Sequence, residues 1–219
     1  MNVSISELTE ALAGRFVKGL PSIGSIQKTR DDAPALIVGE NLRIPLSNDL
    51  SKLNGVVRID PGEARFGTST FFGQLLDLAK ITKGGQLGKQ LDPLVLTITD
   101  GVAAYPRYKI PLGEFTIESE GSVDLGKRTV NVVTWVPLGN LTDQAAGMFG
   151  ANIGLGGLVG EAPILDKASM VPFRTRGSYD DPKTSADLDL FAKNVLKQVN
   201  PVDLLKKGLD QLLPKKDGK

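Results

Sequence analysis

Three consecutive runs decide the fold of this chain: Glu114-Phe115-Thr116-Ile117-Glu118, Ser122-Val123-Asp124-Leu125 and Thr129-Val130-Asn131-Val132. Apolar and polar residues alternate in each run, and Gly, Pro or Asp residues bound the runs. Alternation with a period of two is typical of a β-strand that turns one face to water and the other to an apolar core. The sequence therefore predicts an antiparallel sheet with one polar and one apolar face.

Similar β-like segments lie on both sides of these runs. They are separated by turn residues such as Gly39-Glu40-Asn41, Asn54-Gly55 and Asp60-Pro61-Gly62. The segments cover residues 36–38, 42–46, 56–60, 63–66, 94–99 and 170–175, and we expect the last of these to be the final strand. The 25 Gly among 219 residues exceed the usual share of about 7%, which favours many tight turns.

Helical patterns occur within the β-like part of the chain and on both sides of it. Ser4 and Glu7 fit a capping box that opens an amphipathic helix, which Gly19 and Pro21 end. Further helices are expected at residues 71–81, 142–149 and 187–199, and from Pro201 onward with Asn200 as the cap. The predicted class is mainly β with α (α+β): a curved antiparallel sheet at residues 33–184 with inserted helices, an N-terminal helix and linker at residues 1–32, and C-terminal amphipathic helices with a basic tail at residues 185–219.

The composition argues against several classes of function. Lys and Arg total 26 against 25 Asp and Glu, so a net charge of +1 disfavours a nucleic-acid partner. With no Cys and no His, the chain lacks thiolate nucleophiles, imidazole bases and the best zinc ligands. No apolar run approaches the roughly 18 residues of a membrane-spanning helix, and the first twenty residues do not resemble a signal peptide.

Close carboxylate pairs and a Gly-rich run are the remaining candidates for a catalytic or phosphate-binding site. Asp180-Asp181 and the pair Asp187 and Asp189 lie near Ser or Tyr residues, but roles in turns and helix caps explain them better. The Gly-rich run at residues 154–160 is followed by no Lys-Ser or Lys-Thr pair, so it fits a hinge or lid rather than a phosphate loop. We expect no catalytic, cofactor or metal site, and hence no enzyme.

A short motif occurs twice. Ile44-Pro45-Leu46 is followed by Gly55, and Ile110-Pro111-Leu112 is followed by Gly121 at the same spacing, at an offset of 66 residues. A genuine duplication would make the sheet two repeated β-meander units. A match this short also arises by chance.

The segment Val171-Pro172-Phe173-Arg174-Thr175-Arg176-Gly177, followed by Asp181-Pro182-Lys183-Thr184 and Asp187-Leu188-Asp189-Leu190, resembles the end of the AsmA-like C-terminal region. Ile110-Pro111-Leu112 and the alternating runs after it are similar to the preceding strands of that family. The resemblance covers roughly residues 33–199. The chain departs from the family in lacking the membrane anchor and most of the expected length.

That family is related to TamB and to the repeating β-groove lipid-transfer proteins. The resemblance implies a protein of the periplasm and cell envelope of a diderm bacterium, involved in outer-membrane assembly or phospholipid transport. It also implies a taco-shaped sheet whose concave side holds acyl chains, with the C-terminal helices capping or docking it. On this basis the partner is a phospholipid or another acyl-chain lipid, and the chain is a module of a longer protein.

The groove candidates are the apolar members of the alternating runs. They are Val57, Ile59, Leu94, Leu96, Ile98, Phe115, Ile117, Val130, Val132 and Phe173. A large apolar face is rarely left bare, so helix, lipid or partner strand must cover it. An ordinary core covered by the protein's own helices explains the same residues.

Two further interpretations stay open. The helix from Pro201 is apolar on one face and rich in Lys, so it fits either contact with an anionic membrane surface or docking on its own sheet. Open sheet edges favour an alternative function, that of a structural or assembly module that pairs with copies of itself or with other segments of a longer chain and carries no lipid.

Overall fold

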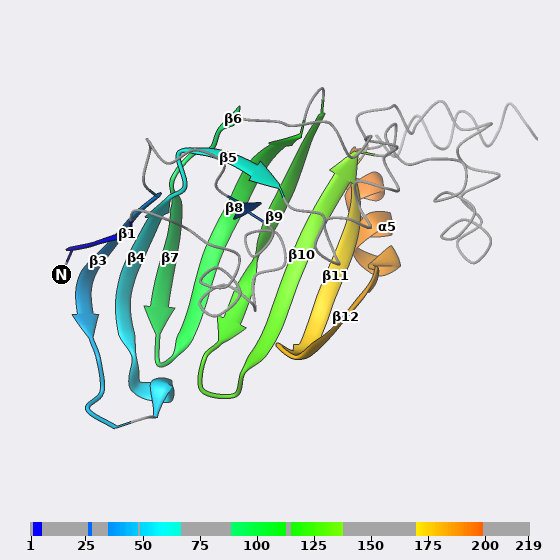
Figure 1. Cartoon of the computed structure of the whole chain (residues 1–219). Helices are drawn as coiled ribbons and strands as arrows, with labels where there is room; N and C mark the ends of the chain where they lie inside the picture. Colours follow the sequence, from blue (N-terminus) through cyan, green and yellow to red (C-terminus); the bar gives the residue numbers. More distant parts are fainter. Residues whose placement is uncertain are drawn as a thin grey trace, which may run out of the picture.

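One open antiparallel sheet dominates the structure, a computed structural model that describes residues 2–5, 26–27, 35–47, 49–66, 89–112, 115–137 and 170–198. The strand order is β1-β3-β4-β7-β8-β9-β10-β11-β12. Figure 1 shows the strands side by side, with β1 and β3 toward one edge and β12 at the other. The strands are β1 (Asn2–Ile5), β3 (Ala35–Arg43), β4 (Asn54–Asp60), β7 (Leu94–Thr99), β8 (Val102–Leu112), β9 (Phe115–Asp124), β10 (Thr129–Pro137), β11 (Met170–Ser178) and β12 (Asp181–Ala186).

The smaller elements connect or flank this sheet. Strand β5 (Glu63–Phe66) pairs with β2 (Ile26–Gln27) and with β6 (Lys89–Gln90) in a second, three-stranded sheet. A 3-10 helix, η1 (Leu50–Lys52), joins β3 to β4, and the helix α5 (Leu188–Gln198) follows β12. From β3 to β12, eight strands form the main sheet in chain order, and the four-residue β1 extends it beside β3.

The alternating runs form strands for the reason the pattern predicts. In β7, Leu94, Leu96 and Ile98 are buried, whereas Thr97 and Thr99 are exposed. Burying a leucine or isoleucine side chain stabilises the fold by about 1.5–3 kcal/mol, and a strand can bury every second residue while it keeps the others in water. The mainly β class with one antiparallel sheet is therefore confirmed.

Three chain connections are joined at one end of the sheet. Asp100 and Gly101 form the β7–β8 turn with φ of 45° and 75°, the left-handed pair that suits a two-residue hairpin. The Gly101 N–H donates to Leu53 O, and the Leu125 N–H donates to Gly101 O, both at 2.9 Å. The η1 segment, the β7–β8 turn and the β9–β10 turn are thus held together by backbone hydrogen bonds.

Helix α5 begins at a capping residue that is also an ion-pair partner. The Asp187 carboxylate accepts the Leu190 N–H at 3.0 Å, which satisfies one of the unpaired donors of the first turn. The other carboxylate oxygen accepts from Arg174 Nε of β11 at 2.5 Å. The helix predicted at residues 187–199 is confirmed within one residue at each end, and α5 lies against β11.

Several sequence-based boundaries are wrong. Residues Asn2–Ile5, where the N-terminal helix was expected to open, form a strand beside β3, because Val3 and Ile5 alternate with polar residues and add to an existing sheet edge. The rest of that expected helix lies outside the described residues. Gly39-Glu40-Asn41 lies inside β3, where Asn41 adopts a φ of 51° and the pairing with β4 shifts, so the segment is a bulge and not a turn.

Two long strands of the main sheet were not predicted from alternation, and only the family resemblance touched the end of β8. The strand β8 contains Pro106 and Pro111, which hide its pattern, and a register shift between Tyr105 and Tyr108 breaks its alternation. The strand β12 follows β11, so residues 170–175 do not belong to the final strand. The helices expected at residues 71–81 and 142–149 and from Pro201 onward lie outside the described residues.

The repeated motif corresponds to different structures in its two copies. Ile110 is fully buried in β8, whereas Ile44 and Leu46 lie in the exposed segment after β3. Only the second halves agree, because Gly55 and Gly121 both lie in strands with strongly positive φ. Among the described residues, the two copies do not form two equivalent β-meander units.

Candidate functional site

The strand register defines one apolar face of the sheet. In an antiparallel pair, residues directly opposite each other point to the same side. Ile59 lies opposite Leu94, and Val57 lies opposite Leu96. Register partners continue this same side of the sheet from β7 to β8, β9, β10 and β11.

Nine of the ten groove candidates lie on this apolar face. They are Val57, Ile59, Leu94, Leu96, Ile98, Ile117, Val130, Val132 and Phe173. The tenth, Phe115, pairs with Leu112 at the ends of β9 and β8, and its side chain lies outside the described residues. Positions far apart in sequence are therefore brought together as one surface across the strands from β4 to β11.

The apolar face is closed to solvent at its centre. Val132 is 0% exposed and Ile117 is 1% exposed. Toward the β3 side, Val57 is only half-buried, as is Ile37 opposite Ile59. The residues of the face are therefore fully buried in its middle and partly exposed at the β3–β4 side.

Sequence reasoning missed the share of this face that comes from β8. Tyr105, Tyr108 and Ile110 are buried on it, because the register shift after Tyr105 returns the later residues to the same side. With the buried Ala103, these residues are spaced by two, three and two positions, and this spacing is the signal in the sequence. A bulge between two alternating halves produces this pattern.

Buried hydroxyl groups interrupt the hydrocarbon of the apolar face. The Tyr105 hydroxyl lies 2.8 Å from Ser119 Oγ, and Thr134 is the register partner of Ser119 on β10. Thr134 Oγ1 is buried and has no hydrogen-bond partner in the part of the chain that the structure describes. Tyr108 donates its hydroxyl proton to Asp92 O at 2.6 Å, and burial, with the nearby carboxylates of Asp92 and Asp60, raises the pKa of Tyr108 to about 12. Tyr108 is therefore a neutral hydrogen-bond donor at neutral pH.

The opposite face of the sheet is mainly polar. Arg107 lies 3.2 Å from Glu118 and 3.7 Å from Glu120, and its guanidinium sits 3.9 Å from the centre of the Trp135 ring. Trp135 is 2% exposed beneath this cation–π contact, in the interior of the sheet and away from either edge. The two faces thus differ in chemistry along the same strands.

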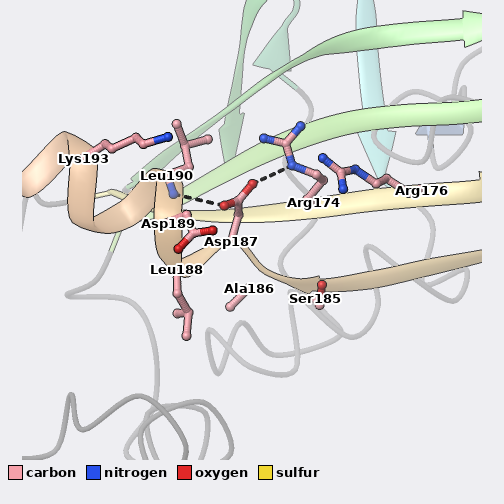
Figure 2. Close-up of a pocket in the computed structure, with 9 residues that line it drawn as sticks. All are labelled: Arg174, Arg176, Ser185, Ala186, Asp187, Leu188, Asp189, Leu190 and Lys193. Atoms are coloured by element: carbon pink, nitrogen blue, oxygen red, sulfur yellow. Dashed lines mark hydrogen bonds and ion pairs between the residues drawn. The ribbon is translucent and has the colours of Figure 1, made fainter.

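Helix α5 lies on the polar side. Arg174 and Arg176 alternate with Phe173 and Thr175 along β11, so they point away from the apolar face. Together with residues of β12 and α5 they line a pocket of about 620 Å³, which Figure 2 shows at the start of the helix. The helix of the described residues therefore does not cover the apolar face.

The acidic pairs have the turn and cap roles that their positions predict. Asp187 caps α5, Asp180 lies in the β11–β12 turn at 3.5 Å from Arg128, and Asp181 pairs with Lys183 at 2.8 Å. Within the described ranges, no group of three or more Asp or Glu side chains could hold a metal ion. The helix of the described part is also too short and too polar to cross a membrane.

Comparison with known proteins does not add to this description of the two faces. No family model, curated protein or solved structure matches it. The resemblance to the AsmA-like region therefore remains a prediction from the sequence, and the function has to be argued from the faces of the sheet.

Proposed function

We propose that this chain is a non-enzymatic lipid-binding and lipid-transfer module of an AsmA-like protein in the cell envelope of a diderm bacterium. In this proposal the apolar face of the sheet holds the acyl chains of a phospholipid or a similar lipid, in the service of outer-membrane assembly or phospholipid transport. No cofactor or catalytic group is needed.

The observation that carries this proposal is the continuity of the apolar face. Side chains from six neighbouring strands, β4, β7, β8, β9, β10 and β11, lie on it in one register. Transfer of each CH₂ group of an acyl chain from water to such a surface is favourable by about 0.8 kcal/mol. Contacts of this kind are made to hydrocarbon and give little selectivity for the headgroup.

The position of α5 supports the same proposal. A helix packed across the apolar face would leave no space there for a lipid. Helix α5 instead lies on the polar side, where its residues line a pocket together with Arg174 and Arg176. The half-buried positions Val57 and Ile37 make the β3–β4 side the expected entry for an acyl chain.

Adjacent valines on β4 provide a matched test. Val57 points to the apolar face and Val56 to the polar face, and both are half-buried. We expect Val57→Asp to lower the affinity for a fluorescent fatty acid by at least about tenfold, because the carboxylate must lose water where the acyl chain binds. Val56→Asp should bind as the wild type does. Equal binding by two folded variants would refute the lipid proposal for this face.

A second candidate function rests on the sheet edge at β3. Strand β1 pairs only with Ala35–Val38, so on the side away from β4 the end of β3 near Arg43 has no strand beside it among the described residues. At the other edge, β12 carries Pro182 and Lys183, which discourage further pairing. In the assembly alternative, a strand of a second copy or of a longer chain adds to β3. Native mass spectrometry separates the two functions, because lipid bound in a defined ratio supports the first and lipid-free oligomers support the second.

A further inference from the structure

A pocket on the polar face lies between the end of the sheet and the first turns of α5. Arg174 and Arg176 of β11 line it, as do Ser185 of β12 and Lys193 of α5. Figure 2 shows the two arginines next to each other along β11, with Lys193 extending from the helix toward them. Three cationic side chains from two elements that are separate in sequence thus share one pocket.

The three cationic side chains differ in their hydrogen bonds and ion pairs with other residues. Arg174 Nε donates to the Asp187 carboxylate, which fixes its guanidinium at the pocket wall. The Arg176 Nε makes only a long 3.4 Å hydrogen bond to Asn131 Oδ1, and neither Arg176 nor Lys193 forms an ion pair with any residue that the structure describes. These two side chains therefore keep donors for a ligand.

The acidic groups of the pocket do not cancel this charge. The lining holds three cationic and two acidic side chains, a difference of one positive charge. Asp187 already accepts from Arg174 and from the Leu190 N–H, and Asp189 is the other acidic side chain of the lining. Arginine recognises phosphate with paired, directional hydrogen bonds, and lysine adds a point charge.

We propose that this pocket binds a phosphate group, with Arg176 and Lys193 as its direct ligands and Arg174 as a positioning residue. The phosphate belongs either to a phospholipid headgroup at a membrane surface or to a free phosphate ion. The pocket lies on the opposite face from the acyl-chain surface, so the proposal stands whatever occupies the apolar face.

Titration calorimetry of the full chain with inorganic phosphate tests the site. We expect saturable binding at low ionic strength, and Arg176→Gln combined with Lys193→Gln should weaken it by at least about tenfold, because two charge-assisted contacts are lost. The matched control is Arg58→Gln combined with Lys52→Gln, an exposed Arg and Lys at β4 and η1 outside the pocket. The control should bind as the wild type does.

Flotation with vesicles distinguishes the two sources of phosphate. Binding to vesicles that contain phosphatidic acid, lost in the pocket variant and displaced by inorganic phosphate, identifies a lipid headgroup. Saturable phosphate binding without any vesicle binding identifies the free ion. The site does not exist if the wild type binds neither, or if the folded pocket variant binds both as the wild type does.

Discussion

At the scale of single residues, two glycines have similar backbone conformations but different surroundings. They therefore distinguish the effect of backbone strain from that of steric crowding. Gly101 and Gly62 have φ of 75° and 61°, in the left-handed region that side chains disfavour. A Cβ on Gly101 would lie 2.5 Å from Leu50 O and 2.7 Å from Ser51 Cα, whereas a Cβ on Gly62 would meet nothing within 4 Å. Gly101 is therefore required both for its conformation and for the close approach of η1.

We expect Gly101→Ala to lower the free energy of unfolding by more than about 2 kcal/mol, because strain adds to displacement of η1. Gly62→Ala should cost about 1 kcal/mol, from strain alone. Urea denaturation of the full chain, followed by fluorescence of the single Trp135, measures both. Equal losses for the two variants would show that η1 does not pack on the β7–β8 turn as described.

At the scale of elements, alternation was a reliable guide where it was unbroken. The runs in β7, β9 and β10 were predicted from the sequence, and their parity selected the apolar face correctly. The pattern failed where local geometry changes the period, at the bulge in β3 and at the register shift in β8. It also failed for β12, whose residues are mostly exposed, because an edge strand needs no apolar alternation.

The pocket on the polar face could not be predicted from such patterns. Arg174 and Arg176 were seen only as part of a family resemblance, and their approach to Lys193 depends on how α5 turns back after β12. That reversal is fixed by tertiary contacts. The Asp187 N–H donates to Pro172 O at 2.8 Å, and the Asp187 carboxylate pairs with Arg174.

The Asp187 cap gives a prediction for α5. Burial acts to raise the pKa of Asp187, but the Leu190 N–H and the Arg174 guanidinium outweigh it and hold the pKa below its usual range. A lowered pKa stabilises the fold above the unfolded-state value of about 3.9, and this contribution is lost as the pH falls through the folded-state pKa.

We expect Asp187→Asn, which keeps a capping oxygen but removes the charge, to reduce the free energy of unfolding by about 1 kcal/mol at pH 7. Denaturation curves between pH 7 and pH 2 should show the gap to the wild type closing at the acidic end. A gap that is independent of pH would mean that the ion pair with Arg174 contributes nothing.

At the scale of the whole molecule, the sheet separates two chemistries. One side carries a continuous set of mostly buried apolar side chains with a few buried hydroxyls, and the other carries charged pairs, the buried Trp135 and the cationic pocket beside α5. In the proposed function the acyl chains lie along the first side, while the second side faces water or a charged surface. The proposal therefore predicts that contact with lipid alternates from residue to residue along each strand.

Photolabelling with a fatty acid that carries a diazirine in its acyl chain, read by tandem mass spectrometry at single residues, measures this alternation. The account predicts labels at Val57 of β4 and at Ile37 of β3, the half-buried positions of the apolar face, with none at the neighbouring Val56, Arg58 or Val38. Labels on the neighbouring residues, or no labels on these strands in a folded protein, would contradict it.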